Sequence, residues 1–151
     1  VSNMYRYGIV LLFLLTTSSL RAQVFTHPDE AFAAMQAQDR PLLLIFQGSD
    51  WCIPCINLEH KVLSQPDFLS FVNNNLVVLK ADFPQQKQLQ ASLVKQYEAL
   101  AEQYDPEGSF PKILLLDRHK KVLHVFPVHY TTPSQLVSDL EKELKKGHAE
   151  M

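Results

Sequence analysis

The sequence predicts an α/β fold in which helices flank a central mixed sheet of four to five strands. A continuous apolar run at residues 42–46 is typical of a strand buried on both faces, and residues 76–81 predict a second strand. Helical patterns lie between them, and such crossovers join parallel strands. Two later apolar runs, 113–116 and 122–126, are joined by a short polar link. This last pair predicts an antiparallel hairpin.

Five helices are expected around this sheet. They cover residues 28–38, about 52–63, 67–72, 85–104 and a last segment that begins at 133. Ser49 or Asp50 is available to cap the second of them. The fourth has the clearest apolar repeat at helical spacing. Thr132 is placed to cap the last helix, with Pro133 in its first position and Gln135 able to complete a capping box.

Length and composition are those of one ordinary globular domain. The chain has 151 residues, of which 46% are hydrophobic and 20% charged. Its formal net charge is -2, which gives no basic surface for nucleic acid. We therefore expect one domain and no nucleic-acid partner.

The first 22 residues differ from the rest. Arg6 precedes a short apolar stretch, residues 9–15, and the segment ends on the small residue Ala22. This arrangement is typical of a secretory signal peptide, and the apolar stretch is short for a membrane span. We expect a signal peptide at 1–22, cleavage after Ala22, and a domain at 23–151 that is periplasmic or secreted in a bacterium. An uncleaved membrane anchor is the alternative.

Cys52 and Cys55 are the only cysteines, and they lie where a strand passes into a helix. The unpaired N–H groups of a helix start favour an anion, so we expect a lowered pKa for the Cys52 thiol. Pro54 fits the first turn of a helix and not its interior, which supports this placement. Cys55, one turn further on, can close a disulfide with Cys52. Cys52 is then the attacking thiol and Cys55 the resolving one.

Two stretches resemble a known family. Residues 51–55, Trp-Cys-Ile-Pro-Cys, resemble the thioredoxin active-site motif Trp-Cys-Gly-Pro-Cys, and "PLLLIFQGSDWCIPC" is similar to exported thioredoxin-like proteins. The distant "YDPEGSFPKILLLD" resembles the stretch in which a cis-proline precedes a core strand. The likeness covers roughly residues 28–146. It implies the thioredoxin fold and an oxidoreductase that reduces or isomerises disulfides of other exported proteins. It implies no cofactor beyond a redox-active Cys52–Cys55 disulfide.

The resemblance also implies a substrate-binding surface. Pro111 is expected to follow a cis peptide bond that turns the backbone of Phe110 toward an extended substrate segment. Trp51, Ile53 and Phe110 would form an apolar groove around Cys52. From local sequence alone, an ordinary trans bond at Pro111 is the commoner case.

One position departs from the family pattern. Thioredoxins proper carry a buried acid six residues before the first cysteine, where this chain has Phe46. Cys55 then needs another base, either water or Glu59; the alternative for Glu59 is a solvated surface acid. Lys80 either favours the thiolate by its charge or is simply exposed. Ile53 and Pro54 bring no charge between the cysteines, which predicts a comparatively reducing potential.

Two other functions stay open from the sequence. One is a binding module with the same fold whose groove holds a partner without turnover. The other is a copper-handling protein, since soft thiolates suit Cu(I), although no metal site is expected from the histidine spacing. The expected partners are exported client proteins with disulfides and a thiol reductant in the membrane or periplasm. We expect a monomer.

Overall fold

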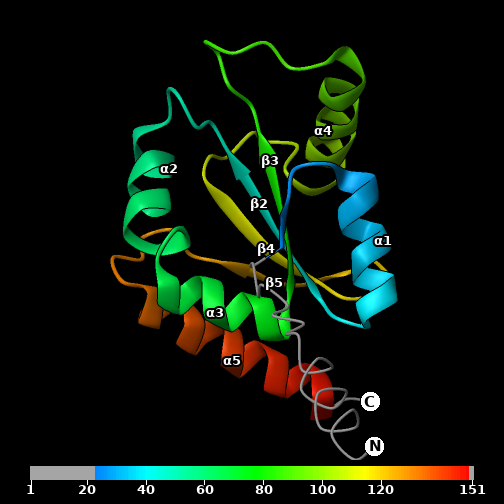
Figure 1. Cartoon of the computed structure of the whole chain (residues 1–151), viewed down its shortest axis with the longest axis vertical. Helices are drawn as coiled ribbons and strands as arrows, with labels where there is room; N and C mark the ends of the chain where they lie inside the picture. Colours follow the sequence, from blue (N-terminus) through cyan, green and yellow to red (C-terminus); the bar gives the residue numbers. More distant parts are fainter. Residues whose placement is uncertain (1–22, 150–151) are drawn as a thin grey trace, which may run out of the picture.

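Five strands form one mixed sheet, with the order β1-β3-β2-β4-β5, in the computed structural model, which describes residues 23–149 (Figure 1). The strands are β1 (Val24–Phe25), β2 (Leu42–Gln47), β3 (Val77–Asp82), β4 (Lys112–Leu116) and β5 (Val122–Phe126). As predicted, β2 pairs in parallel with β3, and β4 and β5 pair antiparallel. The sequence prediction missed β1, a two-residue strand parallel to β3 that is too short for periodicity to reveal.

Helices cover both faces of the sheet. They are α1 (Pro28–Gln38), α2 (Ile53–Leu58), the π-helical turn η2 (Glu59–Leu63), α3 (Pro66–Asn75), α4 (Ala91–Tyr104) and α5 (Pro133–Ala149). Buried side chains of α2, η2, α3 and α5 share one core cluster with the sheet, and those of α1 and α4 share the other. The two groups of helices lie on opposite sides of the sheet in Figure 1. This is the predicted α/β architecture.

The central strand β2 shows why its sequence is apolar without interruption. All six of its residues are buried. Leu43 and Ile45 belong to the cluster beneath α2, whereas Leu44 and Phe46 belong to the cluster beneath α1 and α4. Successive side chains of a strand point to opposite faces, so a strand covered on both faces needs apolar residues at every position.

The predicted start of one helix and the predicted cap of another were wrong. The helix predicted over 85–104 begins at Ala91, because the segment before it hydrogen-bonds elsewhere: Asp50 accepts the backbone N–H groups of Gln85 and Gln86. Neither Ser49 nor Asp50 caps α2, which has Cys52 at its N-cap position.

Two other helices agree in part with their predictions. The predicted turn at 67–72 is part of the longer helix α3, which continues through Asn75. At the start of α5, the side-chain oxygen of Gln135 accepts the N–H of Thr132 at 3.3 Å, one half of the predicted capping box.

The predicted signal peptide, including cleavage after Ala22, lies outside the described residues. None of the helices within residues 23–149 combines the length and the apolar composition needed to cross a bilayer.

Candidate active site

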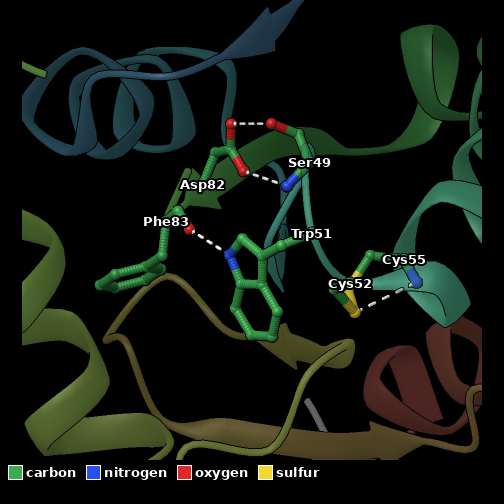
Figure 2. Close-up of a disulfide and its surroundings, with 6 residues drawn as sticks. All are labelled: Ser49, Trp51, Cys52, Cys55, Asp82 and Phe83. Carbon is green, nitrogen blue, oxygen red and sulfur yellow. Dashed lines mark hydrogen bonds between the residues drawn. A yellow bond between two sulfur atoms is a disulfide. The ribbon is translucent and has the colours of Figure 1, made fainter. Parts of the chain in front are cut away.

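A disulfide joins Cys52 and Cys55 where β2 passes into α2, as the sequence predicts. The two Cα atoms are 5.2 Å apart. Cys52 is the N-cap residue of α2, and its sulfur accepts a hydrogen bond from the backbone N–H of Cys55 at 3.3 Å (Figure 2). Pro54 lies in the first turn, where a missing N–H costs nothing. The Cys52 sulfur therefore faces the positive end of a helix.

Both cysteines are largely enclosed by the surrounding chain. Cys52 is 5% exposed and Cys55 is 2% exposed. The slightly more open Cys52 also carries the sulfur that accepts the helix N–H group, so it is the better placed of the two to act as a stabilised thiolate after reduction. Cys55 lies behind it at the distance needed to close the disulfide.

The loop before Cys52 is bonded to the end of β3 and the residue after it (Figure 2). The backbone N–H and the hydroxyl of Ser49 donate to the two carboxylate oxygens of Asp82, at 2.8 and 2.6 Å. The indole N–H of Trp51 donates to the carbonyl oxygen of Phe83 at 2.7 Å. Sequence reasoning assigned no role to Ser49 beyond a cap and none to Asp82 or Phe83. The polar pair before Trp51 was the signal available, but its partners are about thirty residues away in the chain.

Asp50 bonds to the same neighbouring segment. Its two carboxylate oxygens accept the backbone N–H groups of Gln85 and Gln86, at 2.8 and 2.7 Å. The N–H of Gln85 is the main cause that holds the pKa of Asp50 below its ordinary value, against a smaller opposing effect of burial.

Two of the predicted groove residues, Trp51 and Phe110, form an aromatic group with Phe83 next to the cysteine loop. The rings of Trp51 and Phe110 are 5.7 Å apart between centroids, and Phe83 stacks on Phe110 at 5.4 Å. Trp51 is 38% exposed and Ile53, at the start of α2, is 66% exposed. The two residues that flank Cys52 in the chain thus present apolar side chains that are partly open to solvent.

The peptide bond between Phe110 and Pro111 is cis, as the resemblance to the thioredoxin family implied. Pro111 itself is buried, and Phe110 is half-buried. The segment before it is organised by Asp105, whose carboxylate accepts the N–H of Ser109 and the ammonium of Lys112, each at 3.0 Å. This anchors the turn that presents Phe110.

The structure brings together Glu59 and Lys80. Two hydrogen bonds of 2.7 and 2.8 Å join the Lys80 ammonium to the Glu59 carboxylate, with side-chain exposures of 15% and 32%. Lys80 pairs in register with Ile45, which packs in the core cluster beneath α2. Lys80 is therefore not a freely exposed lysine, and Glu59 is not an isolated surface acid.

Phe46, which stands in place of the family's acid, is fully buried in the cluster beneath α1 and α4. Because neighbouring residues of β2 alternate between faces, Phe46 points away from the face on which α2 lies. Glu59 lies one helical turn after the resolving Cys55 and pairs with Lys80. This is the charged pair nearest to Cys55 in the sequence.

No group of three or more His, Cys, Asp or Glu side chains gathers as a metal site would within residues 23–149.

An open cleft of about 630 Å³ lies between the segment after β3 and helix α4, and Phe83, Leu89 and Tyr97 are among the residues that line it.

Comparison with known proteins decides the family. Residues 23–118 match the family model described as thioredoxin-like, which is more than half of the chain. The chain belongs to the thioredoxin-like family. Its mixed sheet with flanking helices is the thioredoxin fold, and its reducible group is its own Cys52–Cys55 disulfide.

Individual relatives support the same placement. This thioredoxin-like chain is 31% identical over 94 residues to the disulfide bond reductase DsbH of Chlamydia pneumoniae, a match that covers 62% of the chain and 56% of the relative. It is 26% identical over 96 residues to the thioredoxin-related protein DsbJ of the same organism, covering 64% of the chain and 27% of the relative. The chain thus spans about half, or less, of the curated relatives it matches.

A solved structure of a DsbH oxidoreductase is similar over a longer stretch. The TM-score is 0.75 at 25% identity, and the match covers 88% of this chain and 92% of that one. A cysteine pair at a helix start in this fold can exchange a disulfide with a second thiol-bearing molecule.

Proposed function

We propose that this chain is a thiol–disulfide oxidoreductase that reduces or isomerises disulfides of other exported proteins. The observation that carries the proposal is the position of the Cys52–Cys55 disulfide, with the Cys52 sulfur accepting an N–H group at the start of α2. A helix start stabilises a thiolate, and the thiolate is the reactive form in disulfide exchange. The name of the relative DsbH, a disulfide bond reductase, supports the same activity.

The reaction has two steps. The Cys52 thiolate attacks one sulfur of a client disulfide; a mixed disulfide forms and the other client sulfur leaves as a thiolate. Cys55 then loses its proton and attacks the Cys52 sulfur, which closes the Cys52–Cys55 disulfide and releases the second client sulfur as a thiolate. Two electrons pass from the protein to the client. A thiol reductant in the membrane or periplasm restores the dithiol.

The client would lie against the aromatic group beside the disulfide. Trp51 and Ile53, the neighbours of Cys52 in the chain, are exposed, and the Phe110 ring lies beside that of Trp51. The backbone of Phe110, before the cis bond to Pro111, would pair with an extended client segment by strand addition. Such binding is sequence-tolerant, which suits an enzyme with several clients.

Glu59 and Lys80 are proposed as modulators of the second step. Glu59 would take up the proton of Cys55, and Lys80 would hold the carboxylate in place and favour the thiolate by its charge. The uncharged Ile53-Pro54 pair between the cysteines favours a reductase over a strong oxidant.

The proposed cellular location rests on the composition of the first 22 residues. Their basic start, short apolar core and small final residue support export to the periplasm or beyond, where a protein would meet disulfide-containing clients. We propose that the chain acts there as a monomer.

The test is trapping of the mixed disulfide. A Cys55→Ser chain, expressed with residues 1–22, should retain exported clients on Cys52 through bonds that dithiothreitol releases. The Cys52→Ser chain is the matched control and should retain none. Purified wild-type protein should reduce insulin, and Cys52→Ser should abolish this. A folded wild-type chain that captures partners without turning over insulin would instead identify a binding module.

A further inference from the structure

Three consecutive residues before Cys52 each bond to the end of β3 or to the segment that follows it. Ser49 donates to Asp82, Asp50 accepts from Gln85 and Gln86, and Trp51 donates to Phe83. These bonds connect positions 32 to 36 residues apart in the chain. The cysteine loop and the 82–86 segment are therefore joined at several positions and not at one point.

Asp50 makes the bonds that reach furthest along this segment, to residues 85 and 86. Its carboxylate accepts two backbone N–H groups, at 2.8 and 2.7 Å, in a segment whose side chains at 85–88 are exposed. Bonds of backbone N–H groups to a carboxylate are charge-assisted and stronger than neutral ones. Without them, residues 85–86 would have only solvent to satisfy their amides. Gln85 also forms part of the wall of the cleft beside α4.

Residues 82–86 in turn hold the aromatic group of Trp51, Phe83 and Phe110 in place. The Phe83 carbonyl oxygen accepts the indole N–H of Trp51, and the Phe83 ring stacks on Phe110. Trp51 thus depends on the 82–86 segment for its orientation, although it precedes Cys52 directly. A shift of residues 82–86 would therefore move the indole ring of Trp51, the residue directly before Cys52.

We propose that Asp50 is a positioning residue for client recognition, which holds residues 85–86 so that Phe83 keeps the Trp51 ring in place beside the disulfide. The inference rests on the proposed function. Asp50 acts through Trp51 and touches neither the sulfur atoms nor the client. Its effect should therefore fall on the binding of a protein client, which lies on the aromatic surface, and not on exchange with a small disulfide that needs only the sulfur atoms.

The experiment compares insulin with cystine as substrates of the full chain. Asp50→Ala should raise the KM for insulin about tenfold, as expected for the loss of charge-assisted hydrogen bonds. The kcat for insulin and the rate with cystine should change by less than about twofold, because the exchange step itself is not altered. Asp50→Asn keeps one acceptor oxygen and should give an intermediate KM, which also provides a second variant if Asp50→Ala fails to fold.

A matched control is available at the other end of the molecule. Asp117 also accepts two backbone N–H groups, from His119 and Lys121 at 2.8 and 2.9 Å, in the link between β4 and β5. Asp117→Ala should leave the KM for insulin unchanged. Emission of Trp51, the one tryptophan of the sequence, should shift to longer wavelength in Asp50→Ala and not in Asp117→Ala.

Three results would overturn the role of Asp50. They are an unchanged KM for insulin in Asp50→Ala, an equal loss with insulin and cystine, or the same rise in KM in Asp117→Ala. These differ from failure of the proposed function, in which the wild-type chain itself reduces neither substrate.

Discussion

A Cβ atom on Gly48 would clash with Cε2 of the Trp51 indole, so the ring of Trp51 occupies the space that any other residue at 48 would need. Gly48 is buried, and its carbonyl oxygen accepts the N–H of Cys52 at 3.0 Å. The close approach of ring to backbone, and not an unusual backbone angle, is what requires glycine here. Gly48 thereby lets Trp51 reach the carbonyl of Phe83.

The first prediction concerns this contact. Gly48→Ala should displace the Trp51 ring, break its bond to Phe83 and lower the free energy of unfolding by about 1–3 kcal/mol, as overpacking does. Urea unfolding and Trp51 emission measure the two effects. Gly147→Ala is the control: nothing lies within 4 Å of its added Cβ, and alanine is favoured in a helix. A Gly48→Ala protein with native emission and stability would contradict the packing described.

The second prediction concerns the two thiols after reduction. Cys52 should react with iodoacetamide faster than Cys55, because it is the more open of the two and its sulfur faces the start of α2. The midpoint of the pH dependence of alkylation should lie below that of free cysteine. Mass spectrometry of partly alkylated protein identifies the residue. A Cys52 as slow and as alkaline as free cysteine would remove the basis of the proposed enzyme.

The third prediction is a pH dependence. The hydrogen bond from Gln85 holds the pKa of Asp50 below its ordinary 3.8, despite the opposing effect of burial. A group with a depressed pKa stabilises the fold fully above its unfolded pKa, and this contribution is lost as the pH falls through the folded value. Trp51 emission should therefore be constant from neutral pH down to about 4 and change below it. Asp50→Asn should lack this component; an identical acid transition in both proteins would show that it does not come from Asp50.

The fourth prediction separates the two steps of exchange. Glu59→Gln or Lys80→Met should lengthen the life of the mixed disulfide by at least about tenfold, as expected for loss of general base assistance, while alkylation of Cys52 changes little. Quenched-flow trapping with insulin measures that lifetime. Lys142→Met breaks a comparable ion pair, with Asp139, on the surface of α5 and serves as the control. Equal lifetimes in all these proteins would leave Glu59 and Lys80 with a structural role only.

The fifth prediction concerns the turn before Pro111. The Asp105 side chain is fully buried and bonded to Ser109 and Lys112, so Asp105→Ala should lower the free energy of unfolding by about 3 kcal/mol. Glu107, which pairs with the same lysine, is 57% exposed. Glu107→Ala should therefore lower the free energy of unfolding far less than Asp105→Ala does. Equal losses in urea unfolding would contradict the anchoring role given to Asp105.

The sequence predicted best the strand that helices cover on both faces. Residues 42–46 are apolar at every position because both faces of β2 are covered, and the prediction missed only Gln47 at its end. The short strand β1 escaped notice because two residues carry no period, and its pairing with β3 is made across the fold.

The local chemistry of the site was also legible in the sequence. The spacing of Cys52 and Cys55 and the place of Pro54 indicated a disulfide at a helix start, since these depend on residues within one turn. The cis bond before Pro111 came from resemblance alone, as local sequence favours the trans form.

By itself, then, the sequence determined the order of the elements and the position of the two sulfur atoms, because periodicity, proline geometry and helix-end electrostatics act between near neighbours. Only the tertiary structure decided that Ser49 and Asp50 bond to the 82–86 segment instead of capping α2, and that Glu59 meets Lys80. Backbone amides and charges find whichever partner the fold brings within about 3 Å, and that partner can lie anywhere in the chain.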